Sequence, residues 1–524
     1  MIELGSYDDH IEKVEKIMTG KFNINRLAAL AVTVIFALLA GGMVYYGTSQ
    51  GIGLMSDSNA YIRNAEMLQK DLLGSFANSE MGVNFPPGYA VSLAAVMRGQ
   101  DPLAGVRWLH VAAGFAVMML MGHWVWSVSR QNLWVLVAVN LALAVNWALI
   151  TIYTKVLSEL LFMVVLYTAL VGMVEFEERQ QWRWMVLAGL AFGVGVLFRY
   201  AGLFFVPLFV VYAGWQGWGR GKQAAFGMGA AGLLAILPPA AWFVRNQLVV
   251  GQALNRGGLE NSYAAAKLWQ LPTQSLFVPM TAELTGAALV FNLAGLALAG
   301  WFLWRCLANW RGLDGPERMT AFVLLAGLVY VALLVVNILF FDPTTPVNDR
   351  ILVPARGLLV PAFFLMLGQL LGKAKWGGWA LLALAVGLVG WHAPKFAGYL
   401  GRVAEKGAGY AGSAWKNHPV VAEAKALKDK MIYTNGRDVL YLLVQNGKID
   451  ILPFKLHRIN RQPMPTFESE MDALCGLVKD GSAVIILFDD FARRVYFPDL
   501  QDILDHCGQV PVEHLDGGVL IGTR

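Results

Sequence analysis

The sequence predicts a multi-pass α-helical membrane protein that carries a small α/β domain at its C-terminal end. Of the 524 residues, 57% are hydrophobic and only 15% are charged, whereas about a quarter of residues are charged in soluble domains. Apolar segments long enough to cross roughly 30 Å of hydrocarbon recur along most of the chain. The net charge of +5 is therefore not interpreted as a nucleic-acid signal, but through the sidedness of Lys and Arg.

Hydrophobic periodicity predicts eleven spans. They lie at 27–48, 104–126, 132–151, 157–175, 183–198, 202–217, 223–243, 285–304, 319–341, 351–372 and 377–393. The expected organisation is an N-terminal segment (1–26), a transmembrane module (27–393) with a first loop at 49–103, a linker (394–416) and an α/β domain (417–524).

The basic residues predict the orientation of these spans. Lys13, Lys16, Lys21 and Arg26 precede the first span, which favours a cytoplasmic N-terminus. No small-residue cleavage site follows that span, so we expect an uncleaved anchor. Alternation then gathers on the cytoplasmic side Arg130, Arg179, Arg183, Arg220, Lys222, Arg305, Arg311, Arg318, Lys373 and Lys375. The first loop and the C-terminal domain are expected outside the cytoplasm, at the plasma (inner) membrane.

The C-terminal region has the pattern of an α/β domain. The apolar runs "MIYT", "KIDILPF", "AVIILFD" and "GVLIGT" are predicted strands, with helices near 437–446, 467–479 and 499–507. The segment "TNGRD" is typical of a plain βα connection rather than of a phosphate-binding glycine loop. Cys475 and Cys507 would be free to pair in an oxidising compartment, although two buried thiols are equally ordinary.

The first loop carries an isolated acidic residue, Asp57, in "LMSDSNAYIRNAEMLQK". The residues that follow it have apolar side chains at helical spacing, which predicts an interfacial helix over 59–73. The apolar positions are Tyr61, Ala65, Leu68 and Leu72. Pro86, Pro87 and Gly88 then precede a second helix that is too short to span. Two interfacial helices in one loop predict a covered groove at the membrane surface.

The outer ends of the predicted spans are unexpectedly charged. The positive-inside rule predicts that short outer loops are poor in cations, yet nearly all of these loops carry one. The charged residues are Lys155, Glu159, Arg199, Arg245, Arg256, Lys267, Asp342, Asp349 and Arg350. Each cation alone is typical of a snorkelling interfacial residue. Together they indicate an anionic ligand, for which the phosphate of a lipid carrier is the obvious candidate.

Several segments, taken in order, resemble a known family. They are Asp57 followed by Tyr61, then "PPGYAVSLAAVMRG", "VRWLHVAAGFAV", "SELLF", "LAFGVGVLFRYAGLFFVPLF", "PPAAWFVRNQLVVGQ" and "DPTTPVNDRILVPA". This order resembles the GT-C glycosyltransferases that use polyprenyl-phosphate sugars, nearest to bacterial protein O-mannosyltransferases and lipid A aminoarabinose transferases (glycosyltransferase family 39-like). The resemblance covers approximately 27–393.

The resemblance implies a GT-C-like fold, a polyprenyl-phosphate-linked sugar donor and an acceptor on the extracytoplasmic face. It places Asp57 at the position of the catalytic base. Many relatives have a second acidic residue there, where this chain has Ser58. Arg350 in "NDRILVP" is the best match for a phosphate-binding residue. Further substrate-binding candidates are Arg199, Arg245 and Lys155, with Tyr61, Tyr89 and Glu159 from the matching segments.

The chemistry of these residue types agrees with that assignment. An acceptor hydroxyl that attacks an anomeric carbon needs a base to take its proton. One carboxylate suffices for an inverting displacement, because a phosphate leaving group needs stabilising positive charge, which arginine supplies. Glycoside hydrolysis usually uses two carboxylates. The alternative interpretation of Asp57 is an N-cap of the following helix, and capping and catalysis are compatible.

Two other functions compete with this interpretation. A transporter or flippase of lipid-linked sugars would show ionisable or Pro-broken segments at mid-membrane. Here the middles of the predicted spans lack ionisable residues, with Arg356 and His110 the nearest exceptions. Pro238 and Pro239 could break one helix, but the sequence shows no partner repeat. An O-antigen-ligase-like enzyme would use a diphosphate-linked donor. No cofactor is predicted; His/Cys ligand spacing is absent from the sequence, and a divalent metal is left open.

Overall fold

A computed structural model of the chain describes residues 24–524. It leaves out 82, 219–220, 254–275, 278–284, 310–311, 342–344, 346, 373, 428, 445–447, 458–460 and 492–493. Several charged residues of the sequence analysis lie outside the described residues. They are Lys13, Lys16, Lys21, Arg220, Arg256, Lys267, Arg311, Asp342 and Lys373.

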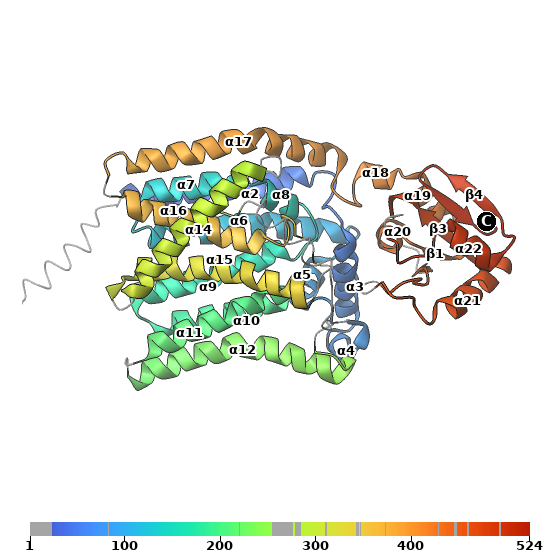
Figure 1. Cartoon of the computed structure of the whole chain (residues 1–524), viewed down its shortest axis with the longest axis horizontal. Coiled ribbons are helices and arrows are strands. Elements are labelled where there is room, and N and C mark those ends of the chain that lie inside the picture. Colours follow the sequence, from blue (N-terminus) through green and yellow to red (C-terminus); the bar gives the residue numbers. More distant parts are fainter. Residues whose placement is uncertain are drawn as a thin grey trace, which may run out of the picture.

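The transmembrane module is a bundle of apolar helices that run side by side (Figure 1). Among the described residues, nine helices are long and apolar enough to cross a membrane. They are α2 (Ile24–Gly47), α6 (Pro102–Val128), α9 (Glu159–Arg179), η2 with α11 (Tyr200–Gly217), α12 (Lys222–Val250), α14 (Thr285–Ala308), α15 (Gly315–Phe340), α16 (Val353–Leu371) and α17 (Gly377–Lys406). Two shorter apolar helices, α7 (Leu133–Ala144) and α10 (Trp182–Phe198), complete the set. Each of the eleven predicted spans therefore contains an apolar helix, as a multi-pass membrane protein requires.

Two predicted spans differ most clearly from the observed helices. The span predicted at 132–151 is broken, because Asn146 caps a separate helix, α8 (Trp147–Tyr153), by accepting from the backbone N–H groups of Ala148 and Leu149. The helix predicted to end at 393 continues to Lys406. Its buried face extends through Phe396, Tyr399 and Val403, so much of the expected linker 394–416 is helical.

The first loop holds the two short helices that the sequence predicts, at one end of the bundle (Figure 1). The first is α3 (Ser56–Lys70), and its buried face packs against α5 (Gly88–Val96). Leu72 does not continue this face. It begins α4 (Leu72–Ala77), which Asp71 caps by accepting from the Gly74 N–H, and a short turn, η1 (Ser79–Met81), follows.

The C-terminal domain is a five-stranded mixed sheet with helices on both faces. The strand order is β2-β1-β3-β5-β4, from β1 (Met431–Thr434), β2 (Ile449–Ile451), β3 (Ala483–Phe488), β4 (Val512–Leu515) and β5 (Gly518–Ile521). β1 pairs in parallel with β2 and β3, whereas β5 pairs antiparallel with β3 and β4. β4 was not predicted, because its residues "VEHL" are largely exposed and show no apolar alternation.

Three helices of this domain agree with the predicted ranges: α20 (Arg437–Val444), α21 (Phe467–Lys479) and α22 (Leu500–Cys507). Two further helices, α18 (Ser413–Lys416) and α19 (Pro419–Ala426), were not predicted. A disulfide between Cys475 and Cys507 joins α21 to α22. The prediction had left this pairing open.

Basic residues predicted to share the cytoplasmic side gather at the end of the bundle opposite to α3. Arg318 Nη2 lies 2.8 Å from Glu177 Oε2, and Arg305 Nη2 lies 3.1 Å from Glu317 Oε1. Arg130 pairs with Asp314 at the same end. The two ends of the bundle are thus chemically distinct, and the compartment that each end faces stays a prediction.

Candidate active site

Three distant segments of the chain come together just before Asp57. The Gly53 N–H donates to Thr154 O at 2.9 Å, and the Val156 N–H donates to Gly53 O at 2.8 Å. On the other side, the Tyr410 N–H donates to Leu54 O at 2.8 Å, and the Leu54 N–H donates to Ala408 O at 3.4 Å. We call residues 53–54, 154–156 and 408–410 the clamp. It fixes the backbone that carries Asp57 to two other parts of the chain.

Gly53 lets the three segments of the clamp approach closely. A Cβ at this position would lie 2.7 Å from Ala408 Cβ and 2.9 Å from Thr154 O. Any larger residue would therefore push the segments apart.

Asp57 lies in the first turn of α3 but does not cap it. The N-cap position is Met55, whose backbone N–H donates to Ser58 Oγ at 2.9 Å. The Ser58 hydroxyl donates in turn to Val156 O of the clamp at 2.9 Å. The capping interpretation of Asp57 is therefore wrong, because Ser58 closes the end of the helix. The Asp57 carboxylate points instead at a cation.

That cation is Arg350, which bridges two carboxylates. Arg350 Nη1 lies 2.6 Å from Asp57 Oδ2, and its Nε donates to Glu159 Oε1. Arg199 Nη1 lies 2.6 Å from the same Glu159 oxygen. The Glu159 side chain is 0% exposed, whereas those of Asp57 and Arg350 are 27% and 25% exposed. Glu159 is thus the buried anchor of the two arginines, and Asp57 is the accessible carboxylate.

The ends of three membrane helices position these groups. Glu159 is the first residue of α9, Arg199 follows α10, and Arg350 lies in the turn before α16. Burial alone would lower the pKa of the Arg350 guanidinium. The carboxylates of Glu159 and Asp57 outweigh that effect and hold this pKa above its ordinary value. Arg350 therefore carries a permanent positive charge.

Lys155 adds a third cation beside Arg350. Burial, and then the charge of Arg350, lowers the pKa of the Lys155 ammonium. Among the described residues, Lys155 takes part in none of the ion pairs of the cluster. Three cations therefore surround two carboxylates, which leaves one net positive charge. Such a cluster favours an anionic ligand.

Buried tyrosines line the protein side of the cluster. Tyr61 Oη lies 3.1 Å from Ser158 Oγ, and Arg199 Nη1 donates to that hydroxyl at 3.3 Å. The ring of Tyr89 meets the Tyr61 ring edge to face, with 4.8 Å between centroids. Tyr89 Oη forms a 2.8 Å hydrogen bond with His110 Nε2. These contacts hold Tyr61 rigidly behind the ion cluster.

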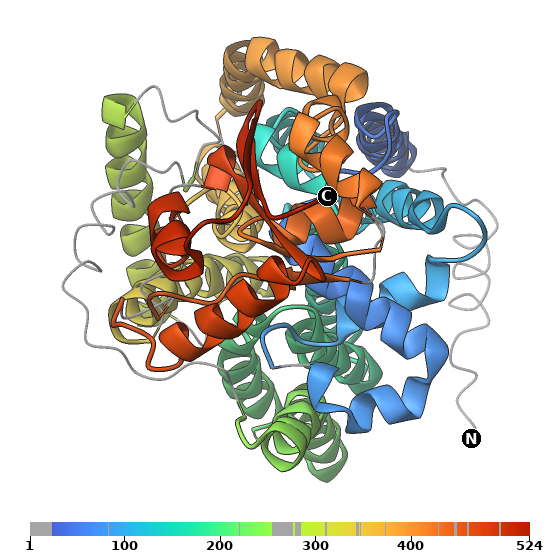
Figure 2. The same cartoon turned by 90° about the vertical axis from the view of Figure 1, so that its right-hand side faces the viewer.

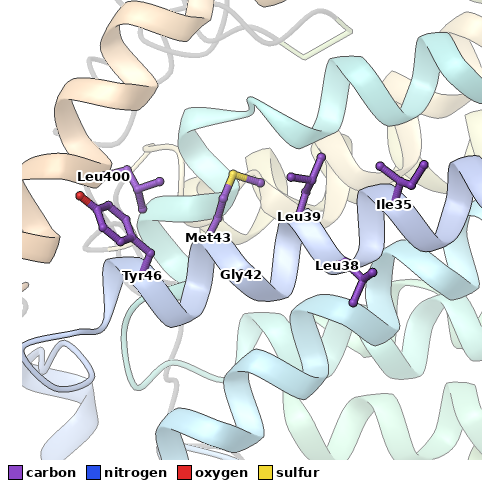
Figure 3. A pocket seen from close by; sticks show the side chains of 7 residues that line it. All are labelled: Ile35, Leu38, Leu39, Gly42, Met43, Tyr46 and Leu400. Atoms are coloured by element: carbon purple, nitrogen blue, oxygen red, sulfur yellow. The ribbon is translucent and has the colours of Figure 1, made fainter.

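Two surface grooves lie elsewhere. One, of about 430 Å³, runs along α2 and is lined by Ile35, Leu38, Leu39, Gly42, Met43, Tyr46 and Leu400 (Figure 3). Another, of about 590 Å³, is lined by residues that include Phe176, Trp182 and Arg183, at the end opposite to Asp57. Neither groove includes a residue of the ion cluster.

The described residues contain no group of three or more His, Cys, Asp or Glu side chains placed to hold a metal ion. The two carboxylates of the site, Asp57 and Glu159, are both engaged by arginines.

Comparisons with known proteins agree with this architecture. Residues 68–244, about a third of the chain, match the family model of the dolichyl-phosphate-mannose-protein mannosyltransferases. ArnT from Cupriavidus metallidurans, in its crystal structure with undecaprenyl phosphate, superposes with a TM-score of 0.53 at 12% identity over 96% of this chain and 98% of ArnT. The fold is that of the GT-C glycosyltransferases.

A second GT-C structure superposes almost as widely. The archaeal oligosaccharyltransferase AglB from Archaeoglobus fulgidus, in complex with an inhibitory peptide and a dolichol-phosphate, has a TM-score of 0.52 at 12% identity. The superposition covers 94% of this chain and 74% of AglB. No curated protein sequence matches the chain. The family match includes Lys155, Glu159 and Arg199, but not Asp57 or Arg350.

The GT-C fold brings most of the predicted site residues together. Those that meet in or directly behind the ion cluster are Asp57, Tyr61, Tyr89, Lys155, Glu159, Arg199 and Arg350. Arg245 does not join them. Its guanidinium donates to Phe76 O at 2.7 Å and to Asn78 O at 2.6 Å, so it holds the end of α4. Sequence reasoning missed the contributions of Ser158 and Tyr410. Ser158 had one signal, its place beside Glu159 in "SELLF".

Proposed function

We propose that this protein is an integral membrane glycosyltransferase that moves a sugar from a polyprenyl-phosphate-linked donor to an acceptor hydroxyl, with inversion. The observation that carries the proposal is the ion cluster at one end of the bundle. Three cations surround two carboxylates, of which only Asp57 is accessible. That arrangement combines an anion-binding site with one available base.

Arg350 is the proposed contact of the donor phosphate. Its described contacts use Nε and Nη1, and the rest of its planar fork can serve a phosphate oxygen. Lys155, on the clamp, supplies a second cation near that position. Structures of this fold have been determined with undecaprenyl phosphate and with a dolichol-phosphate. Those lipids support, by analogy of fold, a polyprenyl phosphate as the donor carrier.

Asp57 is the proposed general base. The acceptor oxygen forms a bond to the anomeric carbon while the bond from that carbon to the phosphate oxygen breaks. The acceptor proton passes to Asp57, and the phosphate leaves with its negative charge. Arg350 and Lys155 stabilise that charge as it develops. A single displacement inverts the anomeric centre.

Glu159 takes the part of a positioning residue. Its buried carboxylate holds Arg199 and Arg350 from one oxygen, so it fixes where the positive charge stands. It has no access to the acceptor, because its side chain is fully buried.

The proposed reaction takes place outside the cytoplasm, at the plasma (inner) membrane. Two observations support this side. The basic residues collect at the opposite end of the bundle, as expected for a cytoplasmic face. The disulfide in the C-terminal domain is of a kind that persists in oxidising compartments.

The experiment uses the full chain in proteoliposomes, with a panel of radiolabelled undecaprenyl-phosphate-linked sugars and an envelope extract of the host cell as acceptor. We expect label to move from at least one lipid-linked sugar to the extract. Nucleotide sugars serve as control donors and should not be consumed. Consumption of a nucleotide sugar, with every lipid-linked sugar left intact, would contradict the proposal.

A further inference from the structure

The C-terminal domain lies directly against the helix that carries Asp57. Figure 2 shows the domain in front of the end of the bundle, with α3 beside it. Helix α20 packs on α3 through two polar contacts. Asn59 Nδ2 donates to Asp438 Oδ1 at 3.4 Å, and Tyr441 Oη donates to Glu66 Oε2 at 3.1 Å. We call this α3–α20 interface, with the adjacent residues Tyr410 and Arg494, the seam.

Tyr410 connects the seam to the Asp57 backbone. It belongs to the clamp, where its N–H donates to Leu54 O. Gly409, just before it, has φ +56, and a Cβ there would lie 2.0 Å from Leu54 O, so only glycine permits this approach. The Tyr410 ring packs against both the transmembrane core and one core of the C-terminal domain. Its position is therefore fixed from both sides.

Arg494 reaches the seam from the C-terminal domain. Its guanidinium stacks over the Phe491 ring at 4.0 Å, and Phe491 stacks on Trp415 at 5.6 Å between centroids. Its Nη1 donates to Asn435 O at 2.9 Å. Its Nη2 lies 3.8 Å from Asp438 Oδ2, and the side chain is 24% exposed. Arg494 is thus held in place but still accessible.

Charged residues of both the transmembrane module and the C-terminal domain act on the phenol of Tyr410. Burial first, and then the Asp438 and Asp57 carboxylates, raises its pKa above the ordinary value, although Arg494 opposes the shift. The phenol therefore keeps its proton at neutral pH and can donate a hydrogen bond. Neither the ion cluster nor the proposed donor contacts use this hydroxyl.

From these contacts we propose that the acceptor alcohol binds at the edge of the seam formed by Tyr410 and Arg494, where Tyr410 donates a hydrogen bond to an acceptor oxygen beside Asp57 and Arg494 binds a neighbouring oxygen of the same molecule. This inference rests on the proposed function and adds the acceptor side to it. The reaction is unchanged: the acceptor hydroxyl gives its proton to Asp57 as the new bond to the anomeric carbon forms.

The test compares two Tyr→Phe variants of the same seam. Tyr410→Phe removes the hydroxyl that is proposed to bind the acceptor. Tyr441→Phe is the matched control, because its hydroxyl bonds Glu66 across the same interface. Each full-length variant is assayed for transfer to the envelope extract, for hydrolysis of the same undecaprenyl-phosphate sugar by water, for affinity for undecaprenyl phosphate and for thermal stability.

Tyr410→Phe should raise the KM for the extract, and lower its kcat/KM on the order of 10-fold, the effect of one hydrogen bond to the bound acceptor. Its hydrolysis rate, lipid affinity and melting temperature should match the wild type. Arg494→Gln should act in the same direction, and Tyr441→Phe should stay within about 2-fold of the wild type.

Equal effects of Tyr410→Phe and Tyr441→Phe would overturn the acceptor site in the seam and leave the proposed function intact. The same would follow if Tyr410→Phe lowered the affinity for undecaprenyl phosphate. A wild-type protein that transfers from no undecaprenyl-phosphate sugar would overturn the proposed function, and this inference with it.

Discussion

At the scale of residues, the two carboxylates of the site differ in burial, and this difference separates their proposed roles. Glu159 is fully buried and binds two arginines, whereas Asp57 is partly exposed and binds one. Solvent partly screens the Asp57–Arg350 pair, which is about a quarter exposed, so separating these two side chains costs less than separating the buried Glu159 from its arginines.

Arg350 is the first residue to test. Arg350→Ala should weaken the binding of undecaprenyl phosphate by about 1.5–3 kcal/mol, the scale of a charge-assisted hydrogen bond. Arg350→Lys should restore only part of the affinity, because an ammonium lacks the planar fork. Binding is measured by titration of the detergent-solubilised protein. If the alanine variant bound undecaprenyl phosphate with unchanged affinity, Arg350 would not be the phosphate contact, and Lys155 or Arg199 would take its place.

Glu159→Gln tests the buried anchor. The change leaves Arg199 and Arg350 without their shared counter-charge, which should destabilise the protein by about 3–5 kcal/mol and weaken lipid binding. Glu177→Gln is the matched control, since the Glu177 side chain is only 3% exposed and pairs with Arg318 at the far end of the bundle. It should lower the melting temperature without changing lipid affinity. Similar lipid affinity in the two variants would refute a positioning role for Glu159.

At the scale of elements, hydrophobic patterning predicted much of the fold. Eleven apolar segments gave eleven apolar helices, and the spacing of Tyr61, Ala65 and Leu68 gave α3. The clamp could not be predicted, because it is made of backbone hydrogen bonds between segments about a hundred and several hundred residues apart. Its side chains carry no periodic signal. For the same reason Tyr410, in the expected linker, had no link to Asp57.

The sequence also could not show which basic residues at the outer span ends belong to the candidate site. Positive charge at outer span ends indicated Lys155, Arg199 and Arg350, which the structure brings together. It could not distinguish Arg245, which hydrogen-bonds carbonyl groups at the end of α4. A guanidinium that binds carbonyls and one that binds carboxylates look alike in sequence. Only the packing of α12 against the first loop separates them.

The clamp itself is tested by Gly53→Ala. The new Cβ would lie 2.7 Å from Ala408 Cβ and 2.9 Å from Lys155 Cγ, so the clamp must open. We expect a loss of about 1–3 kcal/mol in stability and a lower transfer rate. Gly401→Ala is the control: it lies inside α17 with nothing within 4 Å of its added Cβ, and it should stabilise by up to about 1 kcal/mol. Equal melting temperatures for the two variants would contradict the clamp.

At the scale of the whole molecule, orientation decides whether the site faces lipid-linked sugars outside the cytoplasm. With eleven spans and a cytoplasmic N-terminus, a reporter fused after Arg524 should be active only in the extracytoplasmic compartment. A reporter inserted after Gln180, between α9 and α10, should be active only in the cytoplasm. Cytoplasmic activity of the Arg524 fusion would contradict the prediction that the chain crosses the membrane an odd number of times.

The central claim is that Asp57 is the base of a sugar transfer from a polyprenyl phosphate. The most direct measurement compares wild type, Asp57→Asn and Asp57→Ala in proteoliposomes with an undecaprenyl-phosphate sugar that the wild type uses. Because Ser58 closes the end of α3, both variants should keep near-normal stability and lipid affinity. Both should lose about 10²-fold or more of the transfer rate, since neither side chain can take the acceptor proton. Near-normal transfer by Asp57→Asn would contradict the account.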